Sequence, residues 1–459
     1  MQPVDGIIVI VWLCIVLTAG VLAGRRAGLE RFWVNERATP TSLLVFTIVA
    51  TQVGGGTVIG IASSSFASGT GFGLVAIVST VTGFLLVAWL APWAKRFGDR
   101  NSAYTLPEVI GKRYGRRAQL AASGIILFAY LSLLAGQLVS AGVLVSIWTG
   151  SSLVLALILA AGGVIVYTAY AGLRGDIVVD AILFWAMGII LFGILLPFVG
   201  TGENLMSTLR SLPSSAWSPL VFGGYTYLVA GILLGGIIPV VSMEMWMRVY
   251  AATTQSKART AFIWSALAVI PFYALPLFLG LAATRIIPSG GNPDRVLFEL
   301  MTSYVPPVFL GICVAGVLSV VISSANTMIV VVSAVIYRDI LGRKAGVEAL
   351  ELRWSRIITF SVGLAGCLFA LAVPDIVQLV INAFFVVGML TPALVGVVLW
   401  RRATGAGAFV SLVLGGITTV AFLPLMPKQA FVPGIILSII AFAVVSKLTR
   451  HAATEDLNM

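Results

Sequence analysis

A group of polar residues lies inside a long apolar run at residues 304–337. Ser319, Ser323, Asn326 and Thr327 are spaced by four and three residues, so they share one face of a helix. Ser324 flanks this face. Hydroxyl and amide oxygens suit a hard cation, whereas zinc or copper would require histidine or cysteine. Such a face is also typical of packed membrane helices, and we favour packing for Ser319 and cation binding for residues 323–327.

Acidic residues also occur in apolar runs, where an ionisable group is a functional candidate by default. Asp180 lies near the start of the run 175–199 and is the stronger candidate. Asp176 lies one turn earlier, and we expect it to be solvated at the inner mouth. Glu244 precedes Arg248 by four residues, which predicts an ion pair at the inner end of the run 224–249.

Glycines interrupt two of the apolar runs near their centres. The run 40–66 contains ATQVGGGTVIG, and the run 224–249 contains GILLGGIIPVV. Each glycine disfavours a helix by about 1 kcal/mol relative to alanine, and irregular backbone at membrane depth is tolerated where it faces a ligand or ion. We therefore predict two broken helices beside a solute. The predicted solute-binding residues are Thr51, Gln52, Gly54, Gly55, Gly56, Gln137, Gly235 and Gly236.

The elements that position these residues must be membrane-spanning helices. The chain of 459 residues is 59% hydrophobic and only 10% charged, with a mean hydropathy of +1.07, which is typical of a polytopic membrane protein. We predict an all-α protein with about 13 spans. They are expected near residues 5–23, 40–66, 71–93, 118–147, 151–171, 175–199, 224–249, 260–284, 304–337, 354–373, 376–400, 404–423 and 429–446.

The basic residues indicate how these spans are oriented. Of the 28 Lys and Arg residues, 24 fall on one side if the loops alternate. The positive-inside rule then places the N-terminus outside and the C-terminal tail, 447–459, in the cytoplasm. The net charge of +11 is thereby explained by topology, and we expect no nucleic-acid partner. The expected location is the inner (plasma) membrane.

The two interrupted runs are five spans apart and begin on opposite sides of the membrane. Interrupted helices in corresponding positions of two halves indicate a transporter with inverted repeats. The predicted single transporter domain comprises an extra N-terminal helix at 5–23, a first repeat at 40–199 and a second repeat at 224–400. Two extra helices follow at 404–446.

Three stretches resemble the sodium:solute symporter family. They are YTLPEVIGKRYG at 104–115, YAGLRGDIVVDAI at 170–182 and ISSANTMIVVVSAVIYRDI at 322–340. The last matches the family pattern S-[ST]-A-x-[ST] without a gap, and the resemblance covers nearly the whole chain. It implies a LeuT-type core of two inverted five-helix repeats, with Na+ as the coupling ion.

The resemblance also implies ligands for sodium. A shared site would use the carbonyl groups of Ala50, Val53 and Val320 and the hydroxyl groups of Ser323 and Ser324. A possible second sodium would use Asp180, Ser323, Asn326 and Thr327.

These observations favour sodium-coupled symport of a small organic solute into the cell by alternating access. The alternatives are a proton-coupled transporter of the same fold, with Asp180 as the relay, and a membrane-embedded solute sensor. An enzyme is not expected, because no spanning run contains a group of residues that could activate a nucleophile. The expected partners are the solute and the lipid bilayer, with a monomer as the functional unit.

Overall fold

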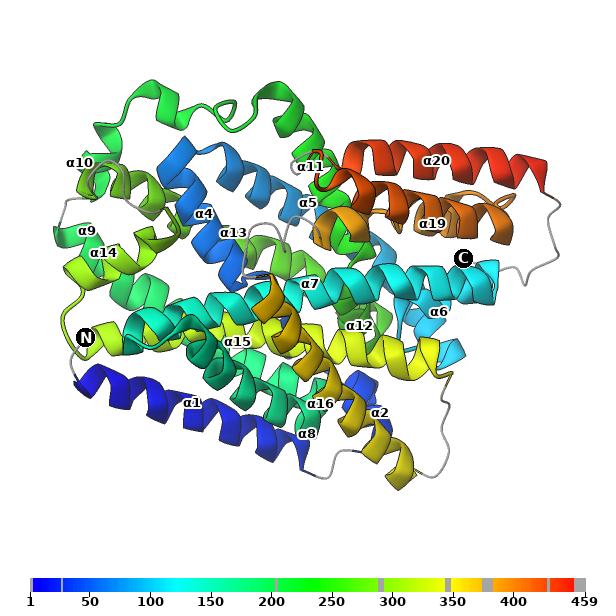
Figure 1. The fold of residues 1–459 in the computed structure, drawn as a ribbon, viewed down its shortest axis with the longest axis horizontal. Helices are drawn as coiled ribbons and strands as arrows, with labels where there is room; N and C mark the ends of the chain where they lie inside the picture. Colours follow the sequence, from blue (N-terminus) through cyan, green and yellow to red (C-terminus); the bar gives the residue numbers. More distant parts are fainter. Residues whose placement is uncertain are drawn as a thin grey trace.

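The computed structural model is a bundle of helices, several of which run along the long axis of the molecule while others cross it obliquely (Figure 1). The structure describes residues 3–25, 28–202, 205–287, 293–342, 348–373, 383–426 and 430–449. No strand occurs in these ranges, apart from an isolated bridge between Thr39 and Ala252. The all-α prediction is therefore confirmed.

Within the described ranges, nine helices are long and apolar enough to cross a membrane. One of them is a continuous segment, Leu153–Gly200, made of α8 (Leu153–Gly188), η2 (Ile189–Leu195) and the start of α9 (Leu196–Gly202). The other eight are α1 (Pro3–Gly24), α5 (Gly71–Asn101), α7 (Arg116–Thr149), α13 (Gln255–Ile286), α15 (Phe309–Val335), α16 (Glu348–Ala372), α19 (Gly405–Phe422) and α20 (Phe431–Leu448).

The segment Leu153–Gly200 is too long for one crossing. Its 48 residues would extend about 72 Å as a straight helix, against a hydrocarbon core of about 30 Å. The chain turns at Gly172, where φ is 56° and ψ is −153°, a conformation that favours glycine. A Cβ atom there would lie 2.6 Å from the ring of Phe32. The predicted runs 151–171 and 175–199 meet at this turn.

Two further spans are bent pairs of helices, each with an angle of 47°. The first pair is α3 (Thr41–Gln52) and α4 (Gly55–Ser68), and the second is α11 (Gly224–Val241) and α12 (Met243–Ala251). The two predicted broken helices are thus confirmed. The predicted run 376–400 ends in the apolar helix Ala383–Leu399, which includes α18 (Thr391–Leu399), while 374–382 lie outside the described residues. The total of 13 spans stays a prediction.

Helix α15 forms the centre of the bundle. It packs against α7, α8 and α1 and is almost entirely buried, whereas α1 and α20 expose most of their side chains. An all-round apolar helix is stable on the outside of the bundle only if lipid covers it. A second layer consists of α5, which packs against α13 and α11, and α19 pairs with α20 at the edge of the molecule (Figure 1).

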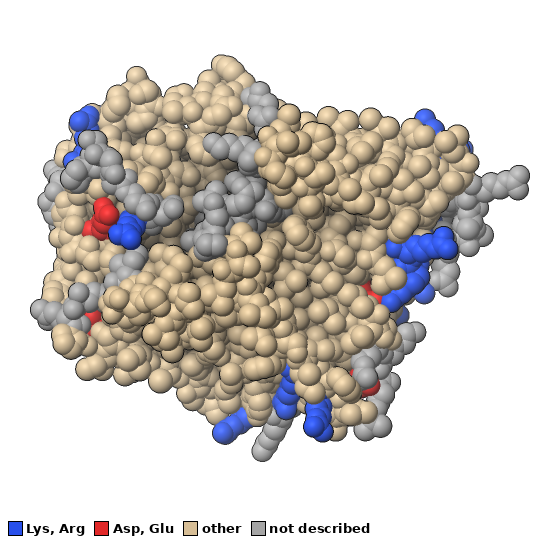
Figure 2. Space-filling model, viewed as in Figure 1, with Lys and Arg blue, Asp and Glu red and all other residues tan. Residues whose placement is uncertain are grey.

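Short helices close the two ends of the bundle. They are α2 (Leu29–Val34), η1 (Asn35–Arg37), α6 (Leu106–Tyr114), α10 (Leu205–Arg210), η3 (Ser214–Trp217), η4 (Pro293–Arg295), α14 (Val296–Tyr304) and η5 (Ile336–Ile340). On the face in Figure 2, Lys and Arg gather at the end where α2 and α6 lie. A broad belt, in which the described residues are uncharged, separates them from the few charges at the opposite end (Figure 2).

Helix α6 joins one of the quoted motifs to the end of α15. Thr105 and Glu108 form a capping box at its first turn, which satisfies amide groups that the helix cannot bond itself. Glu108 also lies 2.8 Å from the guanidinium of Arg338, and that guanidinium stacks 4.3 Å above the ring of Tyr104. The stretches 104–115 and 322–340 therefore contact each other at this end of the molecule.

Candidate functional site

The first helix break leaves the carbonyl end of α3 open to neighbouring helices. The amide of Val53 donates the last helical bond, to Val49, and Gly54 is extended with φ −84° and ψ 172°. The next carbonyl groups accept from other elements: the Ser324 hydroxyl donates to Thr51 at 3.3 Å, and the Tyr273 hydroxyl donates to the carbonyl of residue 52 at 3.2 Å. Side chains thus satisfy carbonyl groups that a helix end leaves unpaired.

Helix α15 reaches this break through Ser323 and Ser324, both of which are buried. A Cβ atom on Gly54 would lie only 2.7 Å from the Oγ of Ser324, so the absence of a side chain there permits the close approach of α15. Ala50 and Val53 are buried at the end of α3. The hydroxyl oxygen of Ser324 and the carbonyl oxygen of Thr51 therefore lie together at the break, and oxygen donors of this kind suit a hard cation. Val320 also lies in α15, and its side chain is outside the described residues.

Asp180 of α8 lies next to this serine pair. Ser323 donates a hydrogen bond to Oδ1 of Asp180, and Thr47 donates to Oδ2. The hydroxyl of Thr51 lies 3.3 Å from the same Oδ2 atom. Because Ser323 donates its hydrogen to the carboxylate, its oxygen atom could still act as a ligand through its lone pairs.

The expectation that Asp176 is solvated is wrong. Its side chain is fully buried, because the turn at Gly172 lays the second half of α8 against α15. Asn326 and Thr327 both donate hydrogen bonds to Asp176, the latter at 3.0 Å. The asparagine also accepts a hydrogen bond from Thr168.

The predicted ion pair between Glu244 and Arg248 is also wrong. The guanidinium of Arg248 is fully buried and lies 2.6 Å from Asp176 and 3.3 Å from Asp180. Glu244 instead accepts a hydrogen bond from Tyr130, whose hydroxyl oxygen also accepts from a backbone amide of α12. Two carboxylates in one apolar run require a cation if both are buried, and this requirement is the signal in the sequence that could have pointed to Arg248.

The four residues predicted for a second sodium are brought together. Asp180 and Ser323 are in direct contact, and Thr327 joins them through Arg248, whose Nη2 atom lies 2.9 Å from the threonine hydroxyl. Asn326 reaches the group through its bond to Asp176. The guanidinium of Arg248, which the sequence did not place here, lies among these oxygen atoms.

Gln137 of α7 lies on the other side of the first break. Its Nε2 atom is 3.2 Å from the position that a Cβ of Gly54 would occupy, and the side chain is 93% buried, with 7% exposed. Its Oε1 atom has no hydrogen-bond partner among the described residues. A buried amide oxygen without a partner costs about 1–3 kcal/mol, so this atom is a candidate for accepting a hydrogen bond from a ligand. Gln52 is half-buried nearby.

The second helix break lies at Ser242, and the prediction that it lies at Gly235 and Gly236 is wrong. Helix α11 continues through both glycines and through Pro239, and ends at Val241. The proline lacks an amide hydrogen and thereby weakens the last turn. The glycines serve helix packing: a Cβ on Gly235 would lie 2.8 Å from Cβ of Ser79 in α5.

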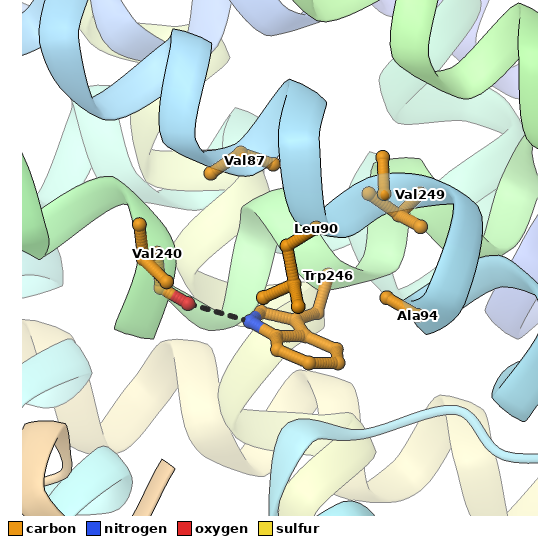
Figure 3. A pocket seen from close by; sticks show the side chains of 7 residues that line it. Val87, Leu90, Ala94, Val240, Trp246 and Val249 are labelled. Carbon is orange, nitrogen blue, oxygen red and sulfur yellow. Dashed lines mark hydrogen bonds between the residues drawn. The ribbon is translucent and has the colours of Figure 1, made fainter. Parts of the chain in front are cut away.

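A small apolar pocket lies beside this second break, between α5 and α12 (Figure 3). Its lining includes Val87, Leu90 and Trp246. The indole nitrogen of Trp246 donates a hydrogen bond of 2.8 Å to the carbonyl of Val240 and so bridges the break (Figure 3). This lining offers no charged group, so the pocket belongs to the packing of the broken helix.

Comparison with known proteins agrees with this architecture. A solved structure of a Na+-coupled sialic acid symporter, in a substrate-bound outward-open state, superposes with a TM-score of 0.85 at 16% identity and covers 99% of both chains. The sodium/pantothenate symporter of Haemophilus influenzae is 24% identical, over 96% of this chain and 95% of its own. The sodium/proline symporter of Staphylococcus aureus is 22% identical, over 98% and 94%.

The fold is thus that of a LeuT-type membrane transporter. The profile of the sodium:solute symporter family matches residues 32–415, and the chain belongs to this family. It is a multi-pass membrane protein that couples the transport of a small solute to Na+.

Proposed function

We propose that the chain imports a small organic solute with a carboxylate group, which binds at the first helix break. The observation that carries the carboxylate is the N-terminus of α4, which begins inside a broken span directly after Gly54. The unpartnered Oε1 atom of Gln137 nearby would accept a hydrogen bond from a donor group elsewhere on the solute. The free amide groups and the dipole at a helix N-terminus favour an anion. Gly54 is the N-cap of α4, and Gly55 and Gly56 are its first two residues, so no side chain of these residues would separate the solute from the backbone.

The relatives support a carboxylate. The names of the similar proteins specify pantothenate, proline and sialic acid, each of which has a carboxyl group. Gln137 would bind a polar donor of the solute, and Gln52 would line the same space. Thr51 contributes through its backbone, because its hydroxyl lies against Asp180 and Arg248. Gly235 and Gly236 would not bind the solute; they would only allow α11 to pack closely against its neighbour.

The sodium ion would bind to Ala50, Val53, Val320, Ser323 and Ser324. Ion and solute would then share the break: the ion at the carbonyl end of α3 and the solute at the amide end of α4. Each would help to order the same few residues, and such coupling is reciprocal by thermodynamic necessity. The two oppositely charged helix ends explain why one break serves a cation and an anion together.

The sodium gradient is sufficient for accumulation. One Na+ entering down about 100 mV releases roughly 2.3 kcal/mol, and a tenfold gradient adds about 1.4 kcal/mol. Both the membrane potential and the Na+ concentration gradient drive the uptake of a zwitterionic solute, which can therefore accumulate several-hundred-fold. A monoanion that enters with one Na+ moves no net charge, so only the concentration gradient drives it.

We also propose the topology predicted from the loops, with the N-terminus outside and the C-terminus in the cytoplasm, and a monomer as the unit of transport. If the loops alternate as predicted, 24 of the 28 basic residues fall on the proposed cytoplasmic side. Cysteine labelling of single exposed positions at the two ends of α1 in intact cells tests the orientation.

The solute is tested by a thermal-shift screen of the purified protein. Pantothenate, proline, sialic acid and short monocarboxylates are compared with their esters or amides, with and without Na+. We expect one carboxylate to raise the melting temperature only when Na+ is present, and its ester to have no effect. Stabilisation by the ester as well, or without Na+, would contradict the proposal. Uptake driven by a pH gradient without Na+ would favour the proton-coupled alternative.

Gln137→Leu provides the site-specific test. It should abolish stabilisation by the solute, because it removes the polar group that faces the break. The control is Gln119→Leu in the same helix, whose amide bonds Asp339 at 2.7 Å away from the break. It should lower the melting temperature and leave the affinity for the solute unchanged. Equal loss of solute binding in both variants would refute the role of Gln137.

A further inference from the structure

The Nη2 atom of Arg248 lies in a cage of five oxygen atoms. Thr51 and Thr327 contribute hydroxyl oxygens at 2.9 Å, and Thr47 contributes one at 3.2 Å. The two carboxylate oxygens lie at 2.6 and 3.3 Å. These residues come from α3, α8 and α15, so three helices converge on one nitrogen atom of α12.

This cage does not match the hydrogen-bonding pattern of a guanidinium group. Nη2 carries two hydrogens, and it cannot satisfy five acceptors with them. Within the described part of the chain, the Nε and Nη1 atoms of Arg248 have no hydrogen-bond partner, although both are buried. Arginine normally binds carboxylates through its planar fork, with two parallel bonds. A shell of oxygens around one point is instead the arrangement that a spherical hard cation requires.

We propose that the guanidinium of Arg248 is a tethered cation that takes the place of a second sodium ion. The inference rests on the proposed function, since it supposes one Na+ at the shared site. The oxygens expected to bind a second Na+, from Asp180 and Thr327, are within 3.3 Å of Nη2. A second Na+ and the guanidinium cannot occupy that position together, so the chain couples transport to one Na+.

The charges of the region agree with this stoichiometry. Asp176 and Asp180 are both fully buried, and buried carboxylates require compensation. Arg248 supplies one positive charge, and one Na+ at the shared site supplies the other. Ser323 lies between them, because its hydroxyl bonds Asp180 while its lone pairs remain for the ion. With a second Na+ in addition, the region would have an uncompensated positive charge.

The covalent attachment of this cation to α12 also lets Arg248 hold helices together. Arg248 lies on α12, the second half of the broken span, and its cage lies on α3, α8 and α15. The buried side chain of Arg248 therefore holds α12 against these helices. A free ion at this position would have to bind and leave in every cycle.

Sodium binding to the purified transporter tests the proposal directly. We expect wild type to bind about one radiolabelled Na+ per chain at saturation, with a Hill coefficient near 1, since Arg248 provides the second positive charge. Arg248→Gln removes this charge and leaves both carboxylates. It should bind about two Na+ per chain, with a Hill coefficient rising toward 2. Arg248→Lys should stay at about one, because it restores a tethered cation.

Lys95→Gln is the matched control. Lys95 is also a buried cation, 1% exposed, but it bonds Asp99 at 2.6 Å and the carbonyl of Tyr250 at 3.1 Å, outside the cage. Its loss should leave the number of bound Na+ ions unchanged. In Arg248→Ala, millimolar guanidinium ion should compete with the second Na+ and restore the wild-type stoichiometry.

The outcomes separate this inference from the proposed function. A wild type that binds two Na+ would overturn the inference and leave sodium coupling intact. A wild type without sodium binding would overturn the proposed function itself. An Arg248→Gln variant that is monodisperse and still binds one Na+ would show that the cage does not accept an ion. If this variant does not fold, the wild-type stoichiometry still decides the question.

Discussion

Replacement of Gly54 by alanine tests the central geometry of the site with a single methyl group. The backbone at Gly54 is extended, with φ −84° and ψ 172°, so alanine fits without conformational strain. Its Cβ, however, would lie 2.7 Å from Oγ of Ser324 and 3.2 Å from Nε2 of Gln137. Both neighbours would have to move, and they are proposed to bind the ion and the solute respectively.

The expected magnitude follows from these contacts. An added methyl group in a packed interior costs about 1–3 kcal/mol, and 1.4 kcal/mol corresponds to a tenfold change in affinity. If the displacement of Ser324 and Gln137 accounts for this cost, the half-saturating Na+ concentration and the dissociation constant of the solute should each rise about 10- to 100-fold. The assay is the Na+ dependence of initial uptake in proteoliposomes, together with solute binding at saturating Na+.

Gly60→Ala, in the helix that follows Gly54, is the control. No heavy atom lies within 4 Å of the position of its added Cβ, and alanine favours a helix by about 1 kcal/mol over glycine. This variant should be as stable as wild type or more stable, with unchanged affinities. If Gly54→Ala and Gly60→Ala show the same Na+ dependence, the close approach of α15 to the break has no functional role.

Three further outcomes follow from the same contacts. Ser323→Ala and Ser324→Ala should each weaken sodium activation while the protein still purifies as one species; uptake against Na+ concentration measures this, and an unchanged half-saturation in both would remove them from the ion site. Asp180→Asn should raise the half-saturating Na+ concentration at least about tenfold, because it removes a negative charge beside the ion; isotope binding checks this, and wild-type affinity would contradict it. Gly83→Ala in α5 should lower the melting temperature without changing Na+ affinity, because its Cβ would lie 2.7 Å from Cδ of Pro239 in α11. A change in Na+ affinity would indicate that α11 contributes to the binding site.

The sequence alone determined the class of protein and the local features of its helices. Composition and the length of the apolar runs indicate membrane spans, because the cost of unpaired backbone in lipid leaves few alternatives to a helix. Three adjacent glycines predict a break, since the effect is local to the backbone. The spacing of Ser323 and Thr327 places both on one face of α15, because helical geometry fixes the angle between them. All these inferences depend on neighbours within one element.

Only the tertiary structure decided which charges meet. Arg248 is 72 residues from Asp176 along the chain, and its helical neighbour Glu244 was the nearer partner by sequence spacing. The fold places Tyr130 beside Glu244 instead, and the guanidinium of Arg248 pairs with Asp176 and Asp180. Helix α11 similarly continues past Gly235 because α5 packs against it. A buried charge selects its partner by position in the folded bundle, and no periodicity within a single helix encodes that position.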